Sequence, residues 1–238
     1  MAPVGTIRMS LDGITRLLKA LNNPHEHLNR VIHVTGTNGK GSVCALLEAM
    51  ALEAGLSCGR FTSPHFLHPS ESIRLNGQCI SQSEYQQLAN EVSLADQQSM
   101  TSESIKFESI KSASVQSESS VNRTDPSSDS KMPSYTPDSS PDPTVPISKK
   151  ACTVFEHLTA IAFVAFARAN LDLVILEVGM GGRDDATNVQ GIHKIATIFT
   201  SMSMDHTDYL GPLIQDICAN KAGIMRQGAP VFLEYLRH

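Results

Sequence analysis

The residues best suited to chemistry in this chain lie in one glycine-rich segment, TGTNGKGS, at positions 35–42. Glycines let the backbone turn tightly and point its N–H groups at an anion. The apolar run VIHVT precedes the segment and a helical pattern follows it, which would place the positive end of a helix at the same point. The segment therefore predicts a site for nucleotide phosphates. Its candidate residues are Thr37, Asn38, Gly39, Lys40, Gly41 and Ser42.

The spacing of this segment differs from that of the common phosphate loop. Two residues separate Gly36 from the Gly-Lys pair, and Gly41 lies between Lys40 and Ser42; the common loop has four residues and then Lys followed directly by Ser or Thr. An ordinary glycine-rich turn between a strand and a helix is the alternative. Strand, glycines, lysine and helix together favour the phosphate site.

Further polar residues follow apolar strand-like runs. Glu177 stands near the end of LDLVILEV, and a buried carboxylate is costly unless it is paired or bound to a metal. Ser63 and His65 lie in FTSPHF, and His206 follows Asp205 after KIATIFT. From the residues alone, Glu177 could instead bond a nearby N–H, Ser63 could cap a turn and the histidines could be structural. These groups are candidate site residues at strand ends.

Two other positions have a simpler structural interpretation. Thr153 and Glu156 are three residues apart at the start of an apolar helical pattern, which is the spacing of a capping box. Lys221 lies within a predicted helix, and the sequence by itself gives no reason to single it out. Both positions gain a further meaning only from a family resemblance.

Apolar periodicity around these motifs predicts alternating helices and strands. Helices are expected at about 11–21, 41–54, 153–169 and 213–225, and strands at 31–35, 57–63, 171–178, 194–200 and 229–233. This alternation predicts an α/β fold with a doubly wound, mostly parallel sheet, in which ligands bind at the carboxyl ends of the strands. The polar motifs all fall at such ends.

The middle of the chain has a different composition. Of the 42 residues from 99 to 140, 15 are Ser, and six of the twelve Pro lie between 126 and 146. Such a segment buries too little apolar surface to offset the entropy of ordering it. We expect a disordered insertion at 95–150 that divides one domain into the parts 1–94 and 151–238.

Composition excludes several classes of protein. With 19 Lys+Arg against 24 Asp+Glu the formal net charge is −5, which argues against binding nucleic acid mainly by charge. The sequence contains no apolar run long enough for a transmembrane helix and no secretory signal at its start. Five scattered cysteines form no CxxC pair, so neither a disulfide scaffold nor a zinc site is expected, and a reducing compartment is.

The motifs together resemble a known family. TGTNGKGS, FTSPHF, EVGMGGRDDATN, SMDHTDYLG and NKAGI resemble, in this order, the folylpolyglutamate synthase and dihydrofolate synthase branch of the Mur ligase superfamily. The resemblance covers nearly everything outside the insertion and implies the phosphate-loop fold of the Mur ligase central domain. Members are longer and have a second α/β domain, which this chain is expected to lack.

The resemblance implies roles for individual residues. It assigns Ser63, Glu177 and His206 to a magnesium ion, and Lys40, Lys221 and His206 to catalysis, with Lys221 carbamoylated. It places dihydropteroate against two short segments. Their residues are Thr153, Phe155 and Glu156, and Asp184, Asp185 and Ala186. The chain departs from the family at Phe66 and Asp184, where Leu is usual, and at Asn220, where Glu is common.

The reaction implied by the resemblance is an ATP- and Mg²⁺-dependent amide ligation through an acyl phosphate. The DATN form of the motif favours 7,8-dihydropteroate and L-glutamate as substrates, with folylpolyglutamate synthesis as the alternative. A nucleotide-binding module without catalysis is an alternative of another class, and an unrelated phosphate-loop kinase is a third. Small-molecule partners, no nucleic acid or membrane, a monomeric state and a cytoplasmic or mitochondrial location are also expected.

Overall fold

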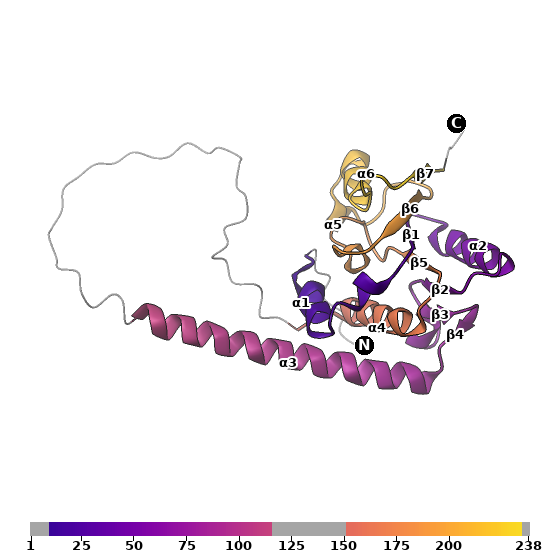
Figure 1. Ribbon diagram of the computed structural model, residues 1–238. Coiled ribbons are helices and arrows are strands. Elements are labelled where there is room, and N and C mark those ends of the chain that lie inside the picture. Colours follow the sequence, from indigo (N-terminus) through magenta and orange to yellow (C-terminus); the bar gives the residue numbers. More distant parts are fainter. Residues whose placement is uncertain (1–9, 116–150, 235–238) are drawn as a thin grey trace, which may run out of the picture.

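The structure is a computed structural model that describes residues 10–115 and 151–234 (Figure 1). A seven-stranded sheet has the order β4-β3-β2-β5-β1-β6-β7. The strands are β1 (Val31–Thr35), β2 (Cys58–Phe61), β3 (Ile73–Leu75), β4 (Gln78–Cys79), β5 (Leu173–Glu177), β6 (Lys194–Phe199) and β7 (Val231–Leu233). The α-helices are α1 (Asp12–Ala20), α2 (Lys40–Glu53), α3 (Gln82–Val115), α4 (Val154–Ala169), α5 (Thr207–Leu210) and α6 (Ile214–Ala222). Short 3₁₀ helices are η1 (Pro24–His27), η2 (Pro69–Ser72) and η3 (Ala186–Asn188).

The predicted mostly parallel sheet is confirmed. Strands β2, β5, β1, β6 and β7 are parallel to one another. Strands β3 and β4 form an antiparallel hairpin at the β2 edge, which we did not predict. Its turn carries Asn76 at φ +48° and Gly77 at φ +80°, and an Asn-Gly pair is a strong hairpin signal. The sequence therefore contained a sign of this hairpin.

Helices cover both faces of the sheet, as a doubly wound fold requires. On β5, Leu173 and Ile175 belong to the apolar cluster under α2. Val174 and Leu176 alternate with them and belong to the cluster that includes α4. The continuous apolar run predicted for this strand thus contributes side chains to the cores on both faces of the sheet. Figure 1 shows α1, α3 and α4 together on the side of the sheet away from α2.

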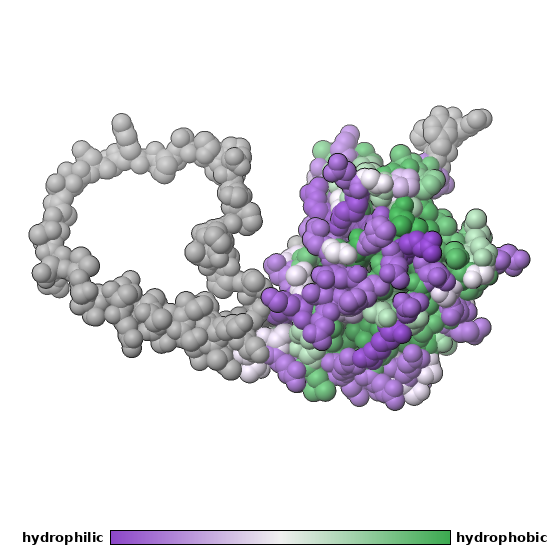
Figure 2. Space-filling view, viewed as in Figure 1, coloured by the Kyte–Doolittle hydropathy of each residue, from purple (hydrophilic) through white to green (hydrophobic). Residues whose placement is uncertain are grey.

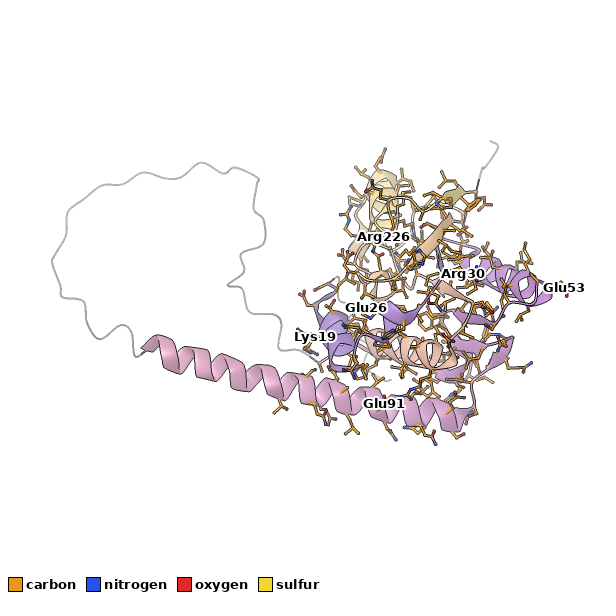
Figure 3. The ribbon with its side chains drawn as sticks, in the orientation of Figure 1. Lys19, Glu26, Arg30, Glu53, Glu91 and Arg226 are labelled. Carbon is orange, nitrogen blue, oxygen red and sulfur yellow. The ribbon has the colours of Figure 1, made fainter. Side chains whose placement is uncertain are left out.

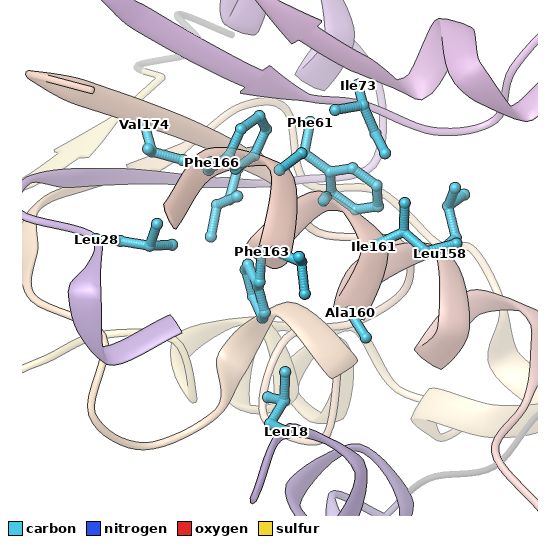
Figure 4. Packing of buried hydrophobic residues seen from close by; sticks show 14 of the residues in the cluster. Leu18, Leu28, Phe61, Ile73, Leu158, Ala160, Ile161, Phe163, Phe166 and Val174 are labelled. Carbon is cyan, nitrogen blue, oxygen red and sulfur yellow. The ribbon is translucent and has the colours of Figure 1, made fainter. Parts of the chain in front are cut away.

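The larger core cluster is built on α4. Phe163 and Phe166 are fully buried there. Figure 4 shows Phe166 near Phe61 and Val174 of the sheet, and Phe163 on the side toward Leu18 of α1. The helix is therefore apolar nearly all round because it lies between the sheet and a second layer of helices.

The predicted start of the insertion at 95 is wrong. Helix α3 continues through this position to Val115, and its Val92 and Asp96 are buried. The carboxylate of Asp96 accepts a hydrogen bond from Arg16 Nη2 of α1 at 2.6 Å. A buried ion pair and an apolar helix face thus order a segment that its serine content led us to assign to the insertion. The remainder of the predicted insertion from 116 to 150 lies outside the described residues.

Exposed apolar side chains gather on one part of the surface. Figure 2 shows hydrophobic side chains gathered on the part of the surface where α2 and β7 lie. Exposed apolar residues there include Leu46, Met50 and Phe232, at 65%, 68% and 56% exposure. No helix within residues 10–115 and 151–234 is both long enough and apolar enough to cross a bilayer.

Candidate functional site

The loop between β1 and α2 has the backbone that an anion site needs. Gly36 has φ +148°, and a Cβ atom at this position would lie 1.8 Å from Thr200 Oγ1. Gly39 has φ +87° and occupies the N-cap position of α2. Both positions therefore require glycine. Thr37 N donates to Ser201 O at 2.7 Å, which ties the loop to the end of β6.

The N-terminus of α2 is open to a ligand. No side chain caps it, and the first helical bond runs from Val43 N to Gly39 O at 3.0 Å. The N–H groups of Lys40, Gly41 and Ser42 at this end point along the helix axis and carry its positive potential. Lys40 Nζ donates to Thr37 O at 3.3 Å, which folds its ammonium group back over the loop. The predicted phosphate-site residues are thus brought together.

Lys221 reaches the same loop from α6. Its side chain is buried, and Nζ donates to Gly36 O at 2.8 Å. Burial, assisted by the positive charge of Lys40, lowers the pKa of Lys221 to about 8. The family resemblance singled out this lysine, but its contact with Gly36 could not be predicted, because only the fold brings α6 beside the β1–α2 loop.

Glu177 joins two of the predicted motifs. It is 4% exposed at the end of β5, and its Oε2 atom accepts a hydrogen bond from Ser63 N at 3.3 Å. A Cβ atom at Gly41 would lie 3.6 Å from the same oxygen, so the first turn of α2 also faces it. Burial raises the pKa of Glu177, and the positive charge of Lys40 opposes that rise. A buried carboxylate with one long hydrogen bond fits a hard cation, which prefers oxygen ligands.

His206 is held differently from the other predicted metal ligands. It has φ +51° at the N-cap of the short helix α5, and its side chain is 47% exposed. Its Nε2 atom lies 3.4 Å from Asp205 Oδ2, and its backbone N donates to Asp205 Oδ1 at 2.8 Å. Among the described contacts of His206, the acidic partner is Asp205 and not Glu177. Ser63 and Glu177 are thus in contact, while His206 is paired with Asp205 in the loop that follows β6.

The start of α4 contains the predicted capping box. Thr153 Oγ1 accepts from Glu156 N at 3.2 Å, and Glu156 Oε2 accepts from Thr153 N at 2.6 Å. The second oxygen of Glu156 accepts from Ile14 N of α1 at 3.0 Å. Glu156 is buried, so its carboxylate joins two helices in addition to capping one.

Phe155 lies between this helix start and the loop after β5. A Cβ atom at Gly179 would lie 2.4 Å from Phe155 Cζ, and the rings of Phe155 and Phe61 are 6.0 Å apart. Gly179 is thus required by the close approach of an aromatic ring. Phe155 is half-buried, which leaves part of its ring for a flat ligand.

Asp185 organises the loop between β5 and β6. Its Oδ1 atom accepts from Thr187 N at 3.0 Å and from Thr187 Oγ1 at 2.5 Å, and its Oδ2 atom accepts from Met180 N at 2.9 Å. Burial raises the pKa of Asp185, although these hydrogen bonds oppose the rise. Ala186 beside it is buried and Asp184 is half-buried. The three predicted residues thus lie on one ordered turn.

A buried polar network behind this turn was missed by sequence reasoning. Lys194 Nζ donates to Asn188 Oδ1 at 2.6 Å and to Ile224 O at 3.0 Å. Arg226, labelled in Figure 3, donates from Nη2 to Asn188 Oδ1 at 2.9 Å. Burial, assisted by the positive charge of Arg226, lowers the pKa of Lys194 to about 7. A lysine opening an otherwise apolar strand was the available signal.

Curated proteins from several organisms resemble this chain over nearly its whole length. It is 32% identical over 225 residues to dihydrofolate synthetase of Saccharomyces cerevisiae, and the matched region covers 94% of this chain and 41% of the relative. It is 35% identical over 227 residues to dihydrofolate synthase/folylpolyglutamate synthase of Mycobacterium tuberculosis, and the matched region covers 94% of this chain and 37% of the relative. No protein-family model matches the chain. The chain spans about two fifths of the length of the curated relatives it matches.

Solved structures give the same result. The chain superposes on FolC of E. coli in complex with DHPP and ADP with a TM-score of 0.68 and 28% identity, over 96% of this chain and 42% of that one. A bifunctional folylpolyglutamate synthase/dihydrofolate synthase with Mn, AMPPNP and L-glutamate bound gives a TM-score of 0.67 at 29% identity, over 96% and 43%. Sequence and fold therefore agree on the proteins that this chain resembles.

Proposed function

Because this chain is related over 94% of its length to dihydrofolate synthases and folylpolyglutamate synthases, we propose that it serves the ATP-dependent ligation of 7,8-dihydropteroate to L-glutamate. The observation that carries the proposal is the convergence of three charged side chains on one loop. Lys40 folds over the β1–α2 loop, Lys221 bonds to it at Gly36, and Glu177 faces the first turn of α2. Phosphoryl transfer requires this kind of positioning and charge compensation.

In the proposed reaction the pteroate carboxylate attacks the γ-phosphate of ATP and ADP leaves, which gives an acyl phosphate. The amine of glutamate then attacks the acyl carbon, inorganic phosphate leaves, and an amide forms. The open N–H groups of α2 and the ammonium group of Lys40 bind and orient the phosphates. Donors aimed at developing negative charge stabilise a transition state best when they are fixed in advance, and hydrogen bonds from Thr37 N and Asn38 N to Ser201 hold this loop in place.

The proposed cofactors are ATP and Mg²⁺. Glu177 and Ser63 fit a magnesium ion because both can offer oxygen ligands and Ser63 N already donates to Glu177 Oε2, the oxygen that faces Gly41 of the phosphate loop. When bound, the ion would neutralise phosphate charge. We assign His206 as the third ligand and as a catalytic residue; its half-exposed side chain would have to turn from Asp205 to take that role.

We propose that Lys221 carries a carbamate. A neutral amine adds to CO₂ to give a carbamate and releases a proton, and a lysine pKa of about 8 leaves part of the amine neutral near pH 7.5. The change would convert a buried cation beside Lys40 into an anion. Its attraction for Lys40 would replace the repulsion that now lowers the pKa of Lys221.

The proposed pterin pocket lies between the start of α4 and the turn after β5. Phe155 offers part of an aromatic face, and the turn with Asp184, Asp185 and Ala186 lies on the other side of Gly179. Thr153 and Glu156 hold the helix start that presents Phe155. We infer that Asp185 acts chiefly by fixing the turn, since Thr187 and Met180 already bond to its oxygens.

The proposed ligation has two alternatives. A reduced folate in place of dihydropteroate would make the reaction folylpolyglutamate synthesis, and relatives carry both names. A nucleotide-binding module is the alternative of another class, because the chain spans only part of its relatives. We propose a monomeric state and a cytoplasmic location, with mitochondria as the alternative site; scattered cysteines support a reducing compartment.

The test is phosphate release from Mg·ATP with 7,8-dihydropteroate, with and without L-glutamate. Glutamate-dependent release with a dihydrofolate product supports the proposed ligase, and release only with a reduced folate supports the alternative acceptor. Binding of Mg·ATP without release supports the module. The variant Lys40→Ala should weaken Mg·ATP binding at least about tenfold, since a charge-assisted contact is worth about 1.5–3 kcal/mol. Lys19→Ala is the matched control, because Lys19 is exposed on α1 (Figure 3).

A further inference from the structure

Three metal-ligating side chains of different chemistry meet between α1, α3 and α4. They are Asp96 of α3, Cys152 just before α4, and His157 of α4. One ligand atom from each lies within 4.8 Å of the others. Among the residues that the structure describes, this is the one place where three ligand atoms from His, Cys, Asp or Glu side chains come this close together.

The distances within the group suit a small ion. His157 Nε2 lies 3.0 Å from Asp96 Oδ2. Two ligand atoms of a tetrahedral zinc ion, each about 2.0–2.2 Å from the metal, are roughly 3.4 Å apart, so a shift of a few tenths of an ångström would admit the ion. Asp96 is 3% exposed, whereas Cys152 and His157 are partly exposed. The side open to solvent provides an entry path and room for water as the fourth ligand.

The second carboxylate oxygen of Asp96 is already positioned by Arg16. Arg16 Nη2 donates to Asp96 Oδ1 at 2.6 Å and lies 3.5 Å from Cys152 Sγ. The guanidinium group therefore occupies Oδ1, while Oδ2 faces His157. Ligating carboxylates are commonly held in this way by an outer partner. The positive charge of Arg16 also offsets the two negative charges that a carboxylate and a thiolate bring.

From this geometry we propose a zinc site formed by Cys152 Sγ, His157 Nε2 and Asp96 Oδ2, with water completing a tetrahedron. Sulfur, nitrogen and oxygen together are typical zinc ligands, and magnesium does not select a thiolate. Binding replaces the S–H bond of Cys152 by a Zn–S bond and releases one proton to solvent. The site is independent of the proposed ligase function.

Zinc must displace the proton of the Cys152 thiol to bind, so the pKa of this thiol affects the affinity for zinc. Burial raises the pKa of the Cys152 thiol, and the carboxylates of Asp96 and Glu156 raise it further while Arg16 lowers it. The free thiol is thus unreactive at neutral pH. A coordinated metal deprotonates a thiol outright, so zinc affinity should rise with pH.

The ligands are discontinuous in sequence, which explains why no zinc site was expected from the cysteine spacing. Asp96 and Cys152 are 56 positions apart, and an ion bound to both would close the long intervening segment at its base. Metal ions that close long loops stabilise the folded state. Zinc should therefore hold α3 and α4 together at this point.

The experiment uses Co²⁺ as a spectroscopic substitute for Zn²⁺ with the full chain after chelation. We expect one Co²⁺ per chain with a thiolate-to-cobalt charge-transfer band that added Zn²⁺ removes. Cys152→Ser should abolish the band, and His157→Gln should weaken Co²⁺ binding about tenfold or more. Cys79→Ser is the matched control, since Cys79 is an exposed thiol on β4, and it should keep the full band.

The outcomes that would overturn the proposal are equally definite. A chain without a thiolate band, or a band that survives Cys152→Ser, would do so. Because Cys152→Ser could impair folding, circular dichroism accompanies it and a second measurement uses the unaltered chain. Zn²⁺ should raise Tm of the unaltered chain where Mg²⁺ at the same concentration does not; equal effects of the two ions would also overturn the site.

Discussion

Single charged residues in this protein are best understood through the cost of burying them. Lys194 is 6% exposed, and its ammonium group is offset by two neutral acceptors and by no neighbouring carboxylate among its described hydrogen bonds. Burial therefore lowers its pKa from the ordinary 10.5 to about 7. The stability of the fold should therefore depend on pH through the protonation of Lys194.

The first prediction concerns the pH dependence of unfolding. Between pH 7 and 10.5 the unfolded chain holds a proton on Lys194 that the folded chain has largely lost. The free energy of unfolding should therefore rise with pH through this window, by up to about 1.4 kcal/mol per pH unit from this group. Below pH 7, Lys194 is protonated in both the folded and the unfolded chain, and the full free-energy cost of burying its charge remains. In urea unfolding series, Lys194→Met should remove the part of the slope that comes from Lys194 and leave the smaller part that comes from Lys221, whose pKa is lowered to about 8.

The control for this prediction is Lys19→Met. Lys19 is exposed on α1, so its substitution should leave the slope between pH 7 and 10.5 unchanged. Equal slopes in the unaltered chain and in Lys194→Met would show that Lys194 titrates normally in the folded protein. Its two hydrogen bonds would then be those of an ordinary solvated ammonium group.

At the scale of elements, buried hydrogen bonds decide how the helices join. Glu156 satisfies the N–H groups of Thr153 and Ile14 with its two oxygens, and a Cβ atom at Gly13 would lie 2.4 Å from its Oε1 atom. The contact between α1 and α4 therefore depends on one carboxylate and one glycine.

The second prediction tests this junction. Glu156→Ala should destabilise the chain by about 2–4 kcal/mol, because a cap is worth about 1 kcal/mol and a buried N–H left without a partner costs about 1–3 kcal/mol. Thr153→Ala removes only the cap and should cost about 1 kcal/mol. Urea unfolding measures both. Glu84→Ala, at an exposed position on α3, is the control, and equal losses for Thr153 and Glu156 would contradict a junction role.

The elements differ in how far the sequence could predict them. Periodic apolar runs correctly predicted α1, α2, α4, α6 and the parallel strands, because burial against a layer imposes those patterns. Composition misplaced the start of the insertion, since Asp96 of α3 is ordered by an ion pair with Arg16, which lies 80 positions away. Pairing across such distances leaves no local signature.

The same distinction holds for the candidate site. The glycines and Lys40 could be predicted because a phosphate loop is contiguous in sequence. The position of Lys221 against Gly36 could not, because 185 positions separate them. The contact of Ser63 with Glu177 was expected only from resemblance, and the pairing of His206 with Asp205 follows from the turn at the start of α5. Roles in catalysis stay predictions until activity is measured.

At the scale of the whole molecule, ligand binding should link segments from distant parts of the chain. The proposed nucleotide site draws on the β1–α2 loop, on Glu177 at the end of β5 and on Lys221 of α6. Unfolding any of these elements destroys the site. A ligand that binds only the folded state therefore stabilises the chain as a unit.

The last prediction follows from this linkage. Mg·ATP at about 100 times its Kd should raise the free energy of unfolding by about 2.7 kcal/mol, and Tm should rise with it. Removal of the metal by a chelator in the presence of ATP should reverse much of the shift, since Glu177 would then face the phosphates without an intervening cation. Glu177→Gln should tolerate metal-free ATP better than the unaltered chain does, because it removes that repulsion. A Tm shift that is the same with and without Mg²⁺ would separate nucleotide binding from the Ser63–Glu177 site.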